Sequence, residues 1–127
     1  MNHLVNWIEI PVIDMGRAIA FYSQILGYPL SNLKIGTVTY AIFPSEDHFN
    51  NGALVQGENY KPSIDGVTIY LDGGEDLNHL LSKVPLAGGK VIMKKMFLSK
   101  DAGYIGMFID TEGNKIGVQN FDYRASL

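Results

Sequence analysis

The fold is decided by the stretch WIEIPVIDMGRAIAFYSQILGY, residues 7–28. At its start, the β-branched residues Ile8, Ile10 and Val12 alternate with other residues, which predicts a strand. Asp14 follows, and its carboxylate can accept hydrogen bonds from the free backbone N–H groups at the start of a helix. Gly27 comes where a left-handed residue would end that helix. The stretch therefore predicts a strand followed directly by a capped helix.

The predicted helix is amphipathic, because its apolar residues recur at intervals of three and four. These residues are Met15, Ala18, Ile19, Tyr22, Ile25 and Leu26. Short β-prone segments follow, separated by turns, and we expect them to form strands that cover this apolar face. The expected strands are residues 30–33, 37–43 and 53–56, with a polar loop over residues 45–52 and a connector over residues 57–63.

The same plan restarts in the second half. Residues 67–71 predict a strand, and Glu75 and Asp76 stand where negative charge favours the start of a helix. That helix has an apolar face of Leu77, Leu80, Leu81 and Val84, contains Pro85 near its end, and stops at Gly88 and Gly89. Further strands are expected at residues 90–98, 104–109 and 115–121, with a hairpin turn at residues 110–114.

The two halves correspond in register, because Ile10 to Gly27 spans about the same distance as Ile69 to Gly88. A repeat of ~60 residues is too long for a solenoid unit and indicates a duplicated module. We therefore expect an α+β fold with two tandem βαβββ modules, at about residues 4–57 and 64–122, within one domain over residues 1–127.

Composition limits the classes of function. The net charge of −3 argues against a nucleic-acid partner, and the absence of cysteine excludes disulfides and thiolate chemistry. No apolar run approaches the ~18 residues that span a bilayer, so a membrane partner is not expected. We expect a cytoplasmic protein.

Several residues together resemble the vicinal oxygen chelate superfamily, which holds the glyoxalases, the bleomycin-resistance proteins and the extradiol dioxygenases. They are Asp14, Ala18, Phe21, Tyr22 and residues 26–28 in the first half, and Gly88, Gly89 and residues 108–114 in the second. Within that superfamily the chain looks most like the bacterial proteins loosely called glyoxalase-related. The resemblance implies two half-open, curled sheets that enclose a cavity.

In metal-using members of the superfamily, four side chains from the two modules bind the ion. The resemblance places these positions at Trp7, at residues 52–55, near Gly66 and at Gly117, and none of them carries a donor side chain. His3, His48 and His79 are expected to be ordinary exposed histidines. We therefore expect no metal and no other cofactor.

Strand alternation puts Trp7, Glu9 and Pro11 on one face of the first strand, so Glu9 faces the cavity if Trp7 does. A carboxylate there could act as a general acid or base, or simply meet water or a lysine at the rim. The residues expected to line a ligand-binding cavity are Trp7, Glu9, Tyr40, Gly66, Thr68, Tyr70, Lys95, Tyr104, Gly117 and Gln119.

Each of these assignments has an alternative. The aromatic residues could simply pack in the core, and Lys95 belongs to a group of lysines that could protect an exposed edge strand. Three functions remain open: a protein that binds a small, partly apolar organic molecule, a lyase or isomerase for a small carbonyl compound with Glu9 as general base, and an interaction module with a vestigial cavity. A homodimer is expected in each case, because half-open sheets expose strand edges and apolar faces.

Overall fold

The computed structural model of the chain describes residues 4–45 and 51–121, so His3 and His48 lie outside the described residues. The first module contains β1 (Ile8–Pro11), α1 (Met15–Leu26), β2 (Ser31–Ile35), β3 (Val38–Phe43) and β4 (Gly52–Gln56). The second contains β5 (Tyr70–Asp72), α2 (Leu77–Leu86), β6 (Lys90–Ser99), β7 (Gly103–Ile109) and β8 (Lys115–Asn120). This is the predicted order of strand, helix and three strands, twice over.

The two modules have the same sheet topology. The strand orders are β1-β4-β3-β2 and β5-β8-β7-β6, and in each sheet the first strand pairs in parallel with the last. The remaining pairs are antiparallel. The α+β fold of two βαβββ modules is confirmed.

The start and end of α1 follow the sequence prediction. The carboxylate of Asp14 accepts a hydrogen bond from the backbone N–H of Arg17 at 3.1 Å. At the other end Gly27 has φ of 82°, and its N–H donates to the carbonyl of Ser23. A residue with a side chain would be strained in that conformation, which explains the glycine.

The second module departs from the prediction at its first strand. The sequence predicts a strand over residues 67–71, but β5 is limited to Tyr70–Asp72. Val67 is 92% exposed and, with Thr68, belongs to the connector between the modules, which in the structure runs from residue 57 to residue 69. High β-propensity does not make a strand where no neighbouring strand pairs with the segment.

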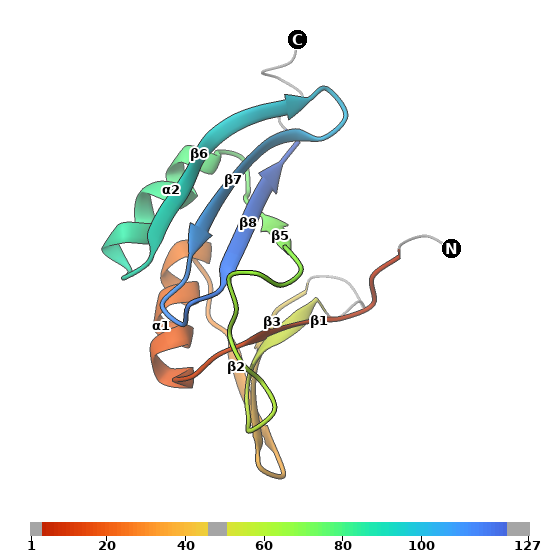
Figure 1. Cartoon of the computed structure of the whole chain (residues 1–127), viewed down its shortest axis with the longest axis vertical. Coiled ribbons are helices and arrows are strands. Elements are labelled where there is room, and N and C mark those ends of the chain that lie inside the picture. The colour runs from red at the N-terminus through yellow and green to blue at the C-terminus, as the bar shows by residue number, and fades with distance from the viewer. Residues whose placement is uncertain (1–3, 46–50, 122–127) are drawn as a thin grey trace.

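Both helices pack on one face of the sheets, and Figure 1 shows them stacked along one side of the molecule. Between helices and sheets lies one core shared by both modules. Its aromatic centre is formed by Phe21, Tyr22, Phe43 and Phe108, with ring centroids 5.0 to 6.4 Å apart. The shared core makes the two modules one packed unit. Within the described residues, no helix has the length and apolar character needed to cross a membrane.

We call the other side of each sheet, directed away from α1 and α2, its open face. In the first sheet, Ile10, Ala41 and Leu54 point into the core, so their neighbours Glu9, Tyr40 and Ala53 point to the open face. The predicted division of the first strand into two faces is therefore confirmed.

Candidate functional site

The open face of the first sheet brings together a carboxylate and three aromatic side chains. Glu9 is aligned with Ala53 of β4, and the next row on the same face contains Tyr40. The indole N–H of Trp7 donates a hydrogen bond to Glu9 at 3.2 Å. Trp7, Glu9 and Tyr40 were all predicted to line one cavity, and the structure places them on one face.

Tyr60 is the fourth member and was not predicted, because it belongs to a Gly- and Pro-containing connector. Its hydroxyl lies close enough to Glu9 and Tyr40 to interact with both electrostatically. The negative charge of Glu9, together with burial and the contacts with Tyr40, raises the pKa of the Tyr60 hydroxyl. The connector between the modules therefore contributes to the site. We call Trp7, Glu9, Tyr40 and Tyr60 the Glu9 cluster.

The open face of the second sheet carries Tyr70, Gly117 and Gln119. A side-chain carbon on Gly117 would collide with the ring of Tyr70, so the ring lies directly over this glycine. The space expected for a ligand at Gly117 is therefore filled by Tyr70. Gln119 donates a hydrogen bond to the carbonyl of Ala102 at 2.7 Å, which fixes it to the β6–β7 turn.

The structure places Tyr104 and Lys95 away from these residues, which corrects their expected place in the cavity. Tyr104 packs against the core, on the face of β7 that also carries Phe108. The ammonium group of Lys95 lies 4.6 Å from the centre of the Tyr104 ring, so it is on that face too. Irregular pairing between Met93 and Met96 interrupts the alternation of β6, so the facing of Lys95 could not be counted along the strand.

The remaining predicted positions lie in the connector. Gly66 is exposed, and Thr68 is partly buried two residues before β5. In the described part of the chain, no group of three or more His, Asp or Glu side chains is arranged to hold a metal ion.

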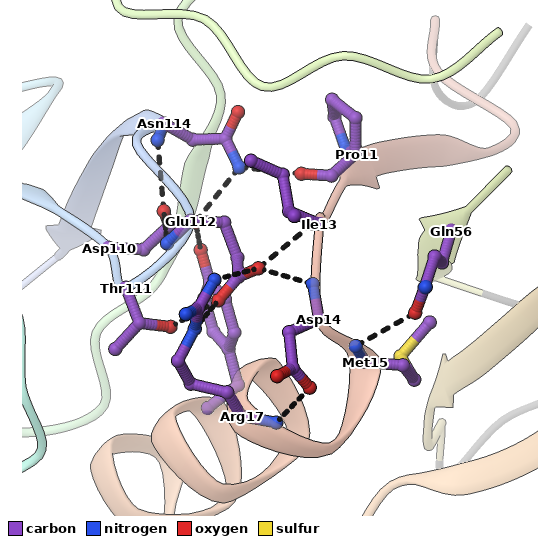
Figure 2. A network of polar contacts seen from close by, with 11 residues as sticks. Pro11, Ile13, Asp14, Met15, Arg17, Gln56, Asp110, Thr111, Glu112 and Asn114 are labelled. Atoms are coloured by element: carbon purple, nitrogen blue, oxygen red, sulfur yellow. Dashed lines mark hydrogen bonds and ion pairs between the residues drawn. The ribbon is translucent and has the colours of Figure 1, made fainter. Parts of the chain in front are cut away.

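A second polar cluster lies at the junction of the modules, where the turn after β7 meets the start of α1 (Figure 2). Glu112 accepts hydrogen bonds from the backbone N–H groups of Ile13 at 2.8 Å and Asp14 at 2.7 Å. It also forms an ion pair with Arg17 at 2.7 Å and accepts a hydrogen bond from Thr111. Burial opposes the ionisation of Glu112, but these donors outweigh it and lower its pKa to about 2.

Asp110 and Asn114 complete this junction network. Asp110 accepts a hydrogen bond from the hydroxyl of Tyr22 at 2.6 Å, and burial together with the Asp110 charge raises the pKa of that hydroxyl. Asn114 donates to the carbonyl of Pro11 at 2.7 Å and accepts from the N–H of Ser63 at 3.0 Å. The network joins the second module to the first module and to the connector, so we assign it to folding.

The surface of the described residues has two hollows, and the second of them borders Tyr60 of the Glu9 cluster. One of about 520 Å³ lies between the end of α1 and the start of α2, beside Tyr28, Asp72 and His79. Another of about 390 Å³ lies beside Tyr60 and Gln56. Glu9 and Trp7 line neither hollow.

Two tandem βαβββ modules with curled sheets define the class of fold. The profile of the Glyoxalase/Bleomycin resistance protein/Dioxygenase superfamily matches residues 4–118, and the chain belongs to this family. A relative from Didymella fabae, described as a glyoxylase-like domain-containing protein, is 30% identical over 120 residues, which cover 87% of this chain and 88% of the relative.

Solved structures show the same fold. A mutant of glyoxalase I from Zea mays superposes with a TM-score of 0.67 at 21% identity, covering 94% of this chain and 47% of the maize chain, so this chain spans about half of that protein. Glyoxalase I from Leishmania major superposes with a TM-score of 0.66 at 18% identity, covering 98% of this chain and 91% of the Leishmania chain. A glyoxalase/bleomycin resistance protein from Albidiferax ferrireducens superposes with a TM-score of 0.62 at 18% identity, covering 90% of this chain and 95% of the other chain.

Proposed function

We propose that this chain binds a small, partly apolar organic molecule on the open face of its sheets, without the metal that many relatives use. The observation that carries the proposal is the Glu9 cluster, in which aromatic side chains surround one polar anchor. Ligand sites commonly combine apolar and aromatic walls with a few placed polar groups.

The sequence at the superfamily's metal positions supports the same proposal. Trp7 and Gly117 replace two of the expected donors, and residues 52–55 contain only Gly, Ala, Leu and Val. These side chains cannot bind a divalent ion. An organic ligand would instead contact the indole ring and the carboxylate next to it.

We further propose that the chain is a cytoplasmic homodimer. All five residues of β2, an edge strand of the first sheet, are exposed, and β6, an edge strand of the second sheet, exposes Met96, Phe97 and Leu98. Exposed edges and apolar residues of this kind are commonly covered by a second copy. Light scattering at micromolar concentration is expected to give twice the chain mass, and a monomer would contradict this.

The proposed binding is tested by a thermal-shift screen of small carbonyl compounds and aromatic acids and amines. A ligand is expected to raise the melting temperature of the native protein, since binding to the folded state stabilises it. Glu9→Gln should abolish that rise. Glu75→Gln is the matched control. Glu75 is exposed at the start of α2, so this substitution removes the same charge at a distant surface position. Equal rises in both variants, or no rise with any compound, would contradict the proposal.

A second candidate function is a lyase or isomerase with Glu9 as general base. The observation in its favour is that the Trp7 indole donates a hydrogen bond to Glu9, which would orient the carboxylate towards a substrate. Such an enzyme would remove a proton next to a carbonyl group. It is tested by deuterium exchange at that carbon, followed by NMR in D₂O. An exchange rate that is at least about a hundredfold lower in Glu9→Gln than in the native protein would support catalysis. Equal exchange rates in the two proteins would exclude it.

A further inference from the structure

We infer that the molecule held by the Glu9 cluster is an organic cation, of the type of an aryl-alkyl ammonium compound. This inference rests on the proposed binding function and names the chemical class of the ligand. It depends on the charge balance around Glu9 and on the kind of side chains that contact it.

The negative charge of Glu9 has no positive partner among the described residues. The one ion pair found there joins Arg17 to Glu112 at the module junction. The described groups that interact with Glu9 are the indole of Trp7, which donates a hydrogen bond to it, and the hydroxyl of Tyr60, and both are neutral. Lys95, a possible cationic partner by sequence, lies over the Tyr104 ring on the other face of the second sheet.

The neighbours of Glu9 are themselves suited to a cation. Tryptophan and tyrosine present negative ring faces that attract ammonium groups within about 6 Å, and tryptophan does so most strongly. Trp7 is 39% exposed, so part of its ring is accessible to a ligand. A carboxylate flanked by Trp7, Tyr40 and Tyr60 therefore offers both an ionic partner and aromatic surface.

An anionic ligand is disfavoured by the same arrangement. A carboxylic acid would place a second negative charge beside Glu9, and like charges at close range repel. Compensation would require an arginine or lysine on this part of the open face, and no described contact brings one to Glu9. The cluster therefore discriminates by charge, in favour of ammonium over alcohol and alcohol over carboxylate.

The test uses three probes with the same ring and chain length: phenethylamine, phenethyl alcohol and phenylacetate. Trp7 is the only tryptophan, so its indole N–H gives a single NMR signal at the proposed site. Each probe is titrated into the full-length protein while this signal is followed. We expect phenethylamine to bind about tenfold more tightly than the alcohol, and phenylacetate to bind most weakly. Glu9→Gln should reduce the preference for the amine to less than about threefold, while Glu75→Gln should preserve it.

A second pair of variants leaves Glu9 in place. Tyr60→Phe keeps the ring and should preserve the preference for phenethylamine, whereas Tyr60→Leu removes the ring and should weaken amine binding several-fold. If the alcohol or the carboxylate binds as tightly as the amine, the inference is overturned while the proposed function stands. If no probe moves the Trp7 signal at millimolar concentration, both are overturned.

Discussion

The chain holds two glutamates in different surroundings, and the contrast separates folding from binding. Glu112 has a fully buried side chain, and an arginine, two backbone N–H groups and a hydroxyl compensate its charge. Glu9 is partly exposed on an open sheet face, contacts neutral donors and has no cationic partner among the described residues. A compensated, buried carboxylate stabilises the fold, whereas an uncompensated one on a surface is available to a ligand.

The largest effect is expected for Glu112→Gln. The amide keeps the shape but removes the charge that holds Arg17, Ile13 and Asp14, and its NH₂ group would face other donors. We expect the free energy of unfolding to fall by about 3 kcal/mol, because Glu112 is buried and loses its ion pair with the half-exposed Arg17 together with two charge-assisted backbone hydrogen bonds. Urea denaturation measures this loss, and a loss below about 1 kcal/mol would show that the junction network contributes little.

The same residue should make stability depend on pH. The pKa of Glu112 is lowered from its ordinary value of 4.5 to about 2 in the folded protein. Because the folded-state pKa is depressed, this contribution is present above pH 4.5 and is lost as the pH falls from 4.5 towards 2. Urea denaturation at several acidic pH values should show a steeper decline for the native protein than for Glu112→Gln. Equal slopes would contradict the assignment.

A smaller effect is expected for Tyr22→Phe. This change removes only the hydroxyl that donates to Asp110 at 2.6 Å inside the core. We expect a loss of about 1–2 kcal/mol in the free energy of unfolding, because the buried carboxylate loses one donor. Tyr28→Phe is the control, since Tyr28 is 37% exposed, and it should change the free energy of unfolding by less than about 0.5 kcal/mol.

Gly66 and Gly117, where the resemblance to the superfamily would place metal ligands, differ in the room around them. Gly117→Ala would push a methyl group into the ring of Tyr70, and we expect a loss of about 1 kcal/mol in the free energy of unfolding. Gly66→Ala should be nearly neutral, because the nearest atom to its added carbon would be 3.9 Å away. Equal effects of the two changes on thermal denaturation would show that the Tyr70 ring is free to move away.

Local patterns predicted most of the fold. The Asp14 cap, the Gly27 stop and the alternation of Glu9 with Ile10 depend on neighbouring residues, and each is as predicted. The site was predicted only in part, because its remaining features depend on distant contacts or local irregularity. Tyr60 reaches Glu9 from a connector, and irregular pairing in β6 hides the facing of Lys95.

The junction network was also outside what local patterns could show. The sequence predicts the hairpin turn at residues 110–114, but not the contact of Glu112 with Ile13, 99 positions away. Tyr22 likewise appears in sequence as one more apolar-face residue, although its hydroxyl binds Asp110 in the other module. Long-range polar contacts of this kind follow from how the modules pack and leave no periodic signal.

The central claim is that Glu9 is kept for binding and Glu112 for folding, and the unfolding free energy of Glu9→Gln tests it most directly. Glutamine retains an acceptor for the Trp7 indole and removes a charge that has no described partner. We expect urea denaturation to give a free energy of unfolding within about 0.5 kcal/mol of the native protein, or slightly above it. A loss of about 2 kcal/mol or more, comparable to that of Glu112→Gln, would show that Glu9 holds the fold together and would contradict the claim.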